Sequence, residues 1–349
     1  MWSRAHRRNE VQPSKRVCEV RIKMKAIFAV PGPEGGVFEY REIPVPSLAV
    51  GEVLIKIRAA GTNRGELIQR SLLRSSNPAL RPMRAGIEFA GEIAELGDGV
   101  SAWHTGERVM GRGLGCYAEF TVVNQRALMR MPDGMGFAEA AAIPNVFVTA
   151  HDAIVTAAAV SADESVMVTA GPSGVGTAAL QIARLLQAKP VIATTRSGSK
   201  STALRALGAD EVVDVSSAQW VNHILEITHN NGVDAIIDQV GGPMLADNIR
   251  LLAIRGRLVS VGRNAGRVGE CDLDEVARKR ASIIGVTFRT RSPEEALQCS
   301  ERFASQMLGA FSNGQLKPVL DRTFPFDRLA DAHAYMLSDA QIGKIVLLM

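Results

Sequence analysis

The chain has 349 residues, of which 46% are hydrophobic and 22% are charged, and its formal net charge is +4 at pH 7. That length supports two domains with substantial cores, and the balance of apolar and charged residues excludes an intrinsically disordered protein. The sequence contains no apolar run of the ~20 residues that span a bilayer, so we expect no contact with a membrane.

The positive charge is concentrated in residues 1–23, which hold seven Lys or Arg and two Glu, so the rest of the chain is close to neutral. This distribution makes a nucleic-acid partner of the folded part unlikely on charge grounds. The segment lacks the apolar centre of a secretory signal, and a transit peptide, a disordered arm and an over-extended start all fit it. We expect residues 1–23 to be disordered and the fold to begin at Met24.

The four cysteines are scattered along the chain and form no C-x-x-C pair; they are Cys18, Cys116, Cys271 and Cys299. Their spacing excludes a cysteine-based zinc lobe and fits a reducing compartment. We therefore expect a cytoplasmic protein.

From residue 24 to about 150, short β-strand patterns alternate with Gly and Pro turns. Three of these strands are expected at 25–29, 52–59 and 90–95, which predicts a compact, barrel-like domain. An Ala-rich stretch over 137–155 then indicates helices that lead toward a second domain.

After residue 165, apolar strand patterns alternate with helical patterns. The strands are expected at 166–170, 191–195, 211–215, 235–239, 257–261 and 282–288. Such alternation predicts an α/β domain with a doubly wound parallel sheet. Beyond residue 292 we expect a helix over 293–311, a strand near 319–321, another helix and a final strand over 344–348.

The stretch 166–176, VMVTAGPSGVG, joins an apolar strand to a helix through a glycine-rich turn. Gly171 lets the turn close, Gly174 leaves room for a pyrophosphate, and Gly176 allows close contact between helix and strand. The free amides and the helix dipole then face an anion. The spacing departs from G-x-G-x-x-G, so an ordinary glycine-rich turn is the alternative to a dinucleotide site. The candidate cofactor residues of this turn are Gly171, Pro172, Ser173, Gly174, Val175 and Gly176.

The residue that senses the ribose 2′ position in a dinucleotide-binding unit lies roughly 20 residues after the last glycine. Arg196 stands there, in a loop TTRSGSK that contains no carboxylate. Its planar guanidinium suits a phosphate, which favours NADP(H), whereas the alternative is a solvated surface loop. The candidate cofactor residues of this loop are Thr195, Arg196, Ser197 and Lys200.

Several segments in collinear order resemble the medium-chain dehydrogenase/reductases, and among these the zinc-independent, ζ-crystallin-like quinone oxidoreductases. They include GEVLIKIRAAGTNRGEL (51–67), GIEFAGEIAELGDGV (86–100), GERVMG (106–111), VDAIIDQVGG (233–242) and IGKIVLL (342–348). The resemblance implies a GroES-like β-barrel catalytic domain over 24–150 and a Rossmann domain over 151–288. It also implies a C-terminal return to the catalytic domain over 289–349, and a homodimer.

Zinc-bearing relatives carry a Cys, a His and a Cys or acidic ligand at positions that here hold Asn63, Ile87 and Asn145. Amides bind Zn²⁺ poorly and Ile cannot bind it, so we expect no catalytic metal. Without a metal to stabilise an alkoxide, the resemblance implies hydride transfer from NADPH to a small, electron-poor acceptor, such as a quinone or an α,β-unsaturated carbonyl.

The resemblance also assigns roles to individual residues. Asn63 faces the nicotinamide and Thr149 contacts its end, as candidate catalytic residues; a turn-stabilising Asn and a buried helical Thr are the alternatives. Glu66 stands where relatives usually have Asp. The remaining cofactor candidates lie at strand ends or at the domain junction, and they are Val240, Gly241, Gly262, Phe288 and Lys344.

Two departures from the family pattern leave alternatives open. The segment LIQRSLLRSSNP (67–78) lacks the tyrosines that line the quinone pocket in ζ-crystallin-like relatives, and Val215 replaces a Tyr beside the 2′-phosphate. Our first hypothesis is an NADPH-dependent quinone reductase. An enone reductase and a non-enzymatic protein that binds NADPH or RNA are the alternatives.

Overall fold

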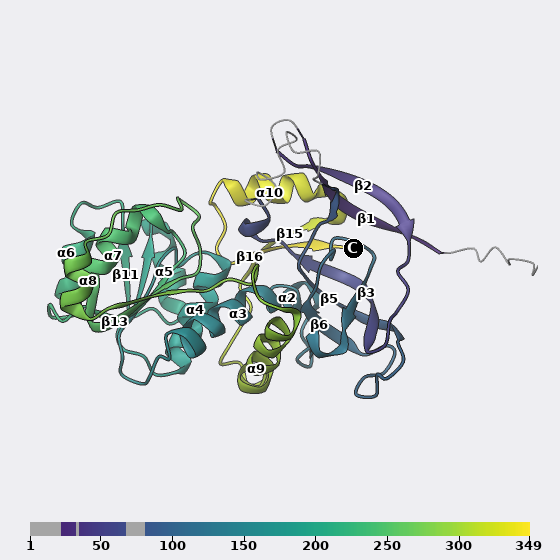
Figure 1. Ribbon diagram of the computed structural model, residues 1–349, viewed down its shortest axis with the longest axis horizontal. Coiled ribbons are helices and arrows are strands. Elements are labelled where there is room, and N and C mark those ends of the chain that lie inside the picture. Colours follow the sequence, from purple (N-terminus) through teal and green to yellow (C-terminus); the bar gives the residue numbers. More distant parts are fainter. Residues whose placement is uncertain (1–21, 33–34, 68–80) are drawn as a thin grey trace, which may run out of the picture.

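The computed structural model describes residues 22–32, 35–67 and 81–349. Two regions lie side by side along its long axis, with the parallel sheet and helices α4 to α8 at one end and the antiparallel strands at the other (Figure 1). The C-terminal segment, in yellow, runs back from the first region into the second. The proposed extension over 1–23 lies almost wholly outside the described residues, but the first strand starts at Lys23, one residue before the predicted start.

The antiparallel region is built from eight strands of the N-terminal half. They are β1 (Lys23–Val30), β2 (Val37–Pro44), β3 (Glu52–Gly61), β4 (Met83–Arg84), β5 (Glu88–Leu96), β6 (Arg108–Arg112), β7 (Phe120–Asn124) and β8 (Leu128–Arg130). In β3, the alternating Val53, Ile55 and Ile57 are buried, so one face of the strand supplies the barrel core. The predicted barrel is confirmed.

The last strands of the chain complete this barrel. β15 (Leu320–Pro325) and β16 (Lys344–Leu348) extend its main sheet, whose order is β15-β16-β3-β5-β6-β8. β16 lies antiparallel to β3, with Val346 opposite Gly61. The first residue of β16 is therefore held next to the end of β3.

The second region is a six-stranded parallel sheet in the order β11-β10-β9-β12-β13-β14. The strands are β9 (Val166–Val168), β10 (Val191–Thr195), β11 (Glu211–Asp214), β12 (Val233–Asp238), β13 (Leu252–Ser260) and β14 (Ser282–Gly285). The flanking helices are α4 (Gly174–Leu185), α5 (Ser201–Ala206), α6 (Trp220–Ile227), α7 (Leu245–Leu251) and α8 (Leu273–Lys279). The predicted doubly wound sheet is confirmed, and its strand order reverses between β9 and β12, where such sheets bind ligands.

The remaining helices are α2 (Phe137–Ala140), α3 (Pro144–His151), α9 (Pro293–Ser312) and α10 (Leu329–Leu337). Helix α3 joins the two regions, because it packs against α4 on one side and against β5 and β6 on the other, whereas α10 packs on β15 and β16. Helix α9 begins at a capping box of Ser292 and Glu295, which agrees with the helix predicted over 293–311. The centre of its Phe311 ring lies 4.9 Å from that of Phe147 on α3. Short 3₁₀ turns lie at Gln125–Ala127, Gly198–Lys200, Gly242–Met244 and Phe326–Arg328.

The stretch Phe137–Ala157, which ends in a π-helical segment (Asp152–Ala157), is long and apolar enough to cross a bilayer, with a mean hydropathy of 1.2. Of its most apolar window, 72% is buried inside the protein. Core helices meet the same criteria of length and composition, so this stretch is weak evidence for a membrane span.

Candidate active site

The glycine-rich turn between β9 and α4 has the geometry of an anion site. Ser173 caps α4, because its hydroxyl accepts a hydrogen bond from the Gly176 amide at 3.0 Å. A Cβ on Gly176 would lie 2.5 and 2.6 Å from the carbonyl oxygens of Gly171 and Ala170, so no side chain fits there. The free N-terminal amides of α4 and its dipole therefore remain open to a phosphate.

The loop after β12 is tied to this turn. The Ser173 hydroxyl donates to the Gln239 side-chain oxygen at 2.8 Å. The Thr169 hydroxyl and the amides of Val240 and Gly241 donate to the Asp238 carboxylate at 2.8 to 3.1 Å. Burial raises the pKa of Asp238 in spite of these donors. The two loops thus form one rigid edge at the point where the strand order reverses.

Two predicted cofactor glycines shape this edge by close backbone contacts. Gly241 has a φ of +93°, and a Cβ there would lie 2.4 Å from the Gly266 carbonyl oxygen. A Cβ on Gly262 would lie 2.5 Å from the Gln239 carbonyl oxygen. Their contact with a cofactor stays a prediction.

The loop after β10 reaches the C-terminal segment. Arg196 donates to the Asp339 carboxylate at 2.5 Å, and its side chain is 74% exposed. Lys200 donates to the carbonyl oxygens of Asp339 and Gln341 at 2.6 and 2.9 Å, and burial lowers the pKa of its ammonium. The Thr195 hydroxyl accepts from the Ser197 amide at 3.1 Å. These residues share one edge of the sheet, and their role toward a 2′-phosphate stays a prediction.

The barrel side presents a polar cluster of Asn63, Glu88, Asn145 and Lys344. The Lys344 ammonium, 3% exposed, donates to Glu88 Oε1 at 2.7 Å, to Asn63 Oδ1 at 2.8 Å and to the Thr62 carbonyl oxygen. The other Glu88 oxygen accepts from the Asn145 amide at 2.7 Å. The Asn145 side chain donates to Asn63 Oδ1 at 2.9 Å. The predicted catalytic Asn63 therefore lies inside a hydrogen-bonded group of four residues.

Lys344 links this polar cluster to the glycine-rich turn. A Cβ on Gly174 would lie 2.8 Å from Lys344 Cδ and 3.0 Å from Val146 Cγ1, so the missing side chain makes room for the lysine stem. The Gly343 amide donates to the Pro172 carbonyl oxygen at 2.8 Å, which fixes the start of β16 against the turn. The sequence analysis placed Lys344 at the domain junction, and the structure places its ammonium on the barrel side of that junction.

The three positions that hold zinc ligands in zinc-bearing relatives carry a poor donor set for a metal here. Asn63 and Asn145 lie together, 2.9 Å apart through their side-chain atoms, but both offer neutral amides. The neighbouring carboxylate of Glu88 is already paired with the Lys344 ammonium, which repels a divalent cation. In the part of the chain that the structure describes, His, Cys, Asp and Glu form no cluster of three suited to a metal.

Thr149 lies on α3 one turn after Asn145, so the two side chains share a helix face, and it is 9% exposed. Phe288 was expected to end the last strand of the parallel sheet, which is wrong: β14 ends at Gly285. β14 pairs with β13 only as far as Ser260, so the strand has no partner beyond that point. Phe288 lies in the following loop, where its ring contacts the guanidinium groups of Arg112 and Arg291.

Three residues of this site were not predicted from the sequence. Glu88 and Arg112 face each other across β5 and β6, and Tyr117 donates its hydroxyl to the Glu66 carboxylate. Burial, with Glu66 as a further cause, raises the pKa of Tyr117 well above its ordinary value, so it stays protonated. Only the pairing of β5 with β6 brings Glu88 and Arg112 together, and the sequence alone does not specify that pairing.

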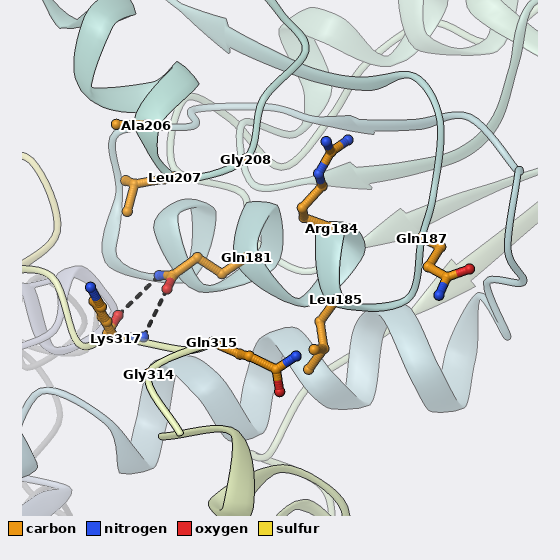
Figure 2. Close-up of a pocket in the computed structure, with 10 residues that line it drawn as sticks. All are labelled: Gln181, Arg184, Leu185, Gln187, Ala206, Leu207, Gly208, Gly314, Gln315 and Lys317. Carbon is orange, nitrogen blue, oxygen red and sulfur yellow. Dashed lines mark hydrogen bonds between the residues drawn. The ribbon is translucent and has the colours of Figure 1, made fainter. Parts of the chain in front are cut away.

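Figure 2 shows a surface pocket at the carboxyl end of α4, far along the helix from the glycine-rich turn. Its Gln181 side chain is bonded to the Lys317 backbone at 2.8 and 3.0 Å, and Arg184 is paired with Asp210 at 3.1 Å. A helix carboxyl end repels anions, so this pocket does not fit a dinucleotide phosphate.

Comparisons with known proteins agree with this architecture. Residues 49–133 match the alcohol dehydrogenase GroES-like domain, and residues 174–305 match the zinc-binding dehydrogenase domain. Human quinone oxidoreductase is 32% identical over 327 residues, which are 93% of this chain and 96% of that protein. An NAD-dependent alcohol dehydrogenase structure is 29% identical with a TM-score of 0.81, and it covers 93% of this chain and 99% of its own. A mycobacterial protein solved in complex with NADPH is 27% identical with a TM-score of 0.82, over 93% and 100% of the two chains.

The matched segments run through both regions and include the glycine-rich turn, β3 and β5. The chain therefore belongs to the medium-chain dehydrogenase/reductase superfamily, in its quinone oxidoreductase branch, and is a nucleotide-dependent oxidoreductase.

Proposed function

We propose that this enzyme transfers a hydride from NADPH to a quinone or a similar activated acceptor without zinc. The observation that carries the proposal is the contact between the glycine-rich turn and the polar cluster through Lys344. An anion site for the cofactor and a set of polar groups for the acceptor are thereby joined by one residue. When bound, NADPH would supply the hydride, and the chain's own residues bind and orient the two reactants.

On the cofactor side, the residues hold and orient. The N-terminal amides of α4 and its dipole suit a pyrophosphate. The absence of a side chain at Gly176 lets the turn close against its own backbone, and the space beside Gly174 is filled by Lys344. The Arg196 guanidinium and the Lys200 ammonium bring positive charge to the edge where a 2′-phosphate would lie. Among the similar structures, one was solved with NADPH and another is an NAD-dependent alcohol dehydrogenase, so the preference for NADPH rests on Arg196 and Lys200.

On the acceptor side, Asn63 donates to an oxygen atom and Lys344 supplies positive charge. The Asn63 side-chain nitrogen is held by Glu88 at 2.8 Å, and its other contacts, with the Gly61 carbonyl oxygen and with Glu66, are 3.5 Å long. The three N–H groups of Lys344 are taken by Thr62, Asn63 and Glu88, so its ammonium acts on an acceptor oxygen through charge alone. A fixed donor and a nearby positive charge stabilise negative charge that develops on the acceptor oxygen, and Thr149 closes the same side. The final proton comes from solvent, and catalysis rests on positioning and exclusion of water.

The direct test is NADPH and NADH oxidation against quinones such as 9,10-phenanthrenequinone, with metal analysis of the same sample. We expect a higher kcat/KM with NADPH, activity that survives chelation, and less than stoichiometric zinc. Asn63→Ala should lower kcat on every acceptor, because it removes a donor to the acceptor oxygen. Stoichiometric zinc, or equal use of NADH, would contradict the proposal.

A conjugated enone is the second candidate acceptor. The Lys344 ammonium, hydrogen-bonded beside Asn63, favours it, because enone reduction develops negative charge on one carbonyl oxygen. Steady-state rates on enones and quinones of similar size separate the two acceptor classes. The resemblance further supports a small-molecule substrate, a homodimer and a cytoplasmic location, which light scattering and fractionation would test.

A further inference from the structure

Arg112 projects into the junction beside the proposed active site. It ends β6 and lies directly opposite Glu88 of β5 in the antiparallel register, so both side chains leave the same face of the sheet. Its guanidinium carbon lies 3.6 Å from the centre of the Phe288 ring, which belongs to the loop after β14. Arg112 therefore reaches from the barrel to the nucleotide-binding region.

The other cations around it already have carboxylate partners. Arg291 donates to Asp152 at 2.6 Å, and Lys344 donates to Glu88 at 2.7 Å. Arg112 takes part in no hydrogen bond or ion pair recorded for residues 22–32, 35–67 and 81–349, and its buried Nε has no partner. A buried donor left unpaired is unfavourable, so this guanidinium is poised for a group that the described residues do not supply.

The charge state supports an anion as that group. Burial lowers the pKa of Arg112 to about 10, while nearby Glu88 raises it, so the guanidinium stays charged at neutral pH. Burial raises the pKa of the neighbouring Cys299 thiol, which is therefore neutral and supplies no counter-charge. The Phe288 ring lies over one face of the guanidinium, so its in-plane N–H groups, among them the unpaired Nε, are the donors that a planar anion would meet.

We propose that Arg112 binds a carboxylate on the electron acceptor, so that the enzyme prefers acidic acceptors over neutral ones of the same shape. This inference rests on the proposed function, because it assumes that the acceptor lies beside the polar cluster. The guanidinium edge donates two parallel hydrogen bonds to the two carboxylate oxygens, which a neutral amide cannot match. Arg112 is thus a specificity residue and takes no part in the hydride transfer.

The test uses three conjugated enones: 4-phenylbut-3-en-2-one, its para-carboxylate and its para-carboxamide. For the wild-type protein we expect the lowest KM with the carboxylate. Arg112→Gln should raise that KM about tenfold or more, as for the loss of a charged hydrogen-bonded pair, and leave the carboxamide KM and the NADPH Kd within about twofold. An equal change with all three enones, or a matching loss of NADPH affinity, would overturn the proposal.

Arg130→Gln is the matched control. Arg130 also stacks on a ring, 4.6 Å from that of Trp103, but it is paired with Glu107 and its side chain is 61% exposed. We expect no change in any of the three KM values. Arg112→Lys keeps the positive charge but not the pair of parallel N–H donors, so it should show only part of the wild-type preference for the carboxylate. This variant also replaces Arg112→Gln in the test if Arg112→Gln does not fold.

A binding measurement separates this inference from the proposed function. Calorimetry with the saturated product 4-(3-oxobutyl)benzoate should show at least about tenfold tighter binding to the wild-type protein than to Arg112→Gln. If such binding is seen but no enone or quinone is reduced, the carboxylate site stands and the proposed function falls. If acceptors are reduced but binding does not depend on Arg112, the carboxylate site falls and the proposed function stands.

Discussion

At the junction between the parallel-sheet region and the barrel, the cofactor side is formed mainly by backbone and the acceptor side by side chains. The centre of the cofactor side is one contiguous stretch of backbone, in which Gly174 and Gly176 matter because they carry no side chain, and the loops after β10 and β12 flank it. The acceptor side consists of side chains from four separate segments, held by hydrogen bonds of Lys344 to residues 256 and 281 positions away. The cofactor site therefore depends on the space around its backbone, whereas the acceptor site depends on the balance of charge between its side chains.

Loss of the Lys344 charge should have the largest effect. Lys344→Met leaves the fully buried Glu88 carboxylate without its cation, at a cost of about 3–5 kcal/mol of unfolding free energy. Acceptor reduction should fall with it. Chemical denaturation measures the first effect, and steady-state rates measure the second.

The double variant Lys344→Met/Glu88→Gln sharpens this result. It removes both charges, so we expect most of the unfolding free energy to return while kcat stays low. A double variant as unstable as Lys344→Met would show that the lysine acts through packing against Gly174 and Val146, not through charge.

Gly176→Val tests the backbone side. Its Cβ would lie within 2.6 Å of two carbonyl oxygens, so the turn must shift, and we expect NADPH affinity to fall on the order of 100-fold, or about 3 kcal/mol. Fluorescence titration with NADPH measures this loss. Gly309→Ala on α9 is the control, because a Cβ there meets no atom within 4 Å. Unchanged affinity in Gly176→Val would refute the turn as the cofactor site.

The difference between the two sides also explains what could be predicted from the sequence. Apolar periodicity predicted all six strands of the parallel sheet, and glycine spacing predicted the turn, because both signals are local. β13 starts at Leu252, five residues before the predicted start, because its register against β12 shifts and Arg255 has a φ of +65°. Such an irregular strand start has no periodic pattern.

The acceptor side was only partly predictable. The resemblance indicated Asn63 and Lys344 separately, but their contact depends on the pairing of β16 with β3 at opposite ends of the chain. Glu88 and Arg112 stand at the ends of β5 and β6, each with other charged residues of the same sign in its strand, and only the β5–β6 register brings them to one face. Charge complementarity between distant strands cannot be inferred from either segment alone.

In the proposed function, Arg196 is the side chain that sets the choice of nucleotide. Arg196→Ala should raise the KM for NADPH about ten- to hundredfold and leave that for NADH within about twofold, because only NADPH carries the 2′-phosphate. The exposed Arg196–Asp339 pair adds at most about 1 kcal/mol to stability, so the melting temperature should barely change. Asp339→Asn removes the competing carboxylate and should lower the KM for NADPH. Equal changes with both nucleotides would remove the proposed role of Arg196.

The smallest expected effect concerns His151, which lies behind the acceptor side on α3 and bonds Gln306 of α9 at 2.6 Å. Burial lowers the pKa of His151 below its ordinary value of 6.5, so the folded protein favours the neutral ring. The neutral His151 ring therefore contributes fully to the unfolding free energy above pH 6.5. This contribution is lost as the pH falls through the lower pKa that the residue has in the folded state. Between pH 7 and pH 5, the unfolding free energy of the wild-type protein should fall more steeply than that of His151→Gln. Identical slopes for the two proteins would show that the scaffold behind the polar cluster is insensitive to this charge, and would limit charge dependence to the cluster itself.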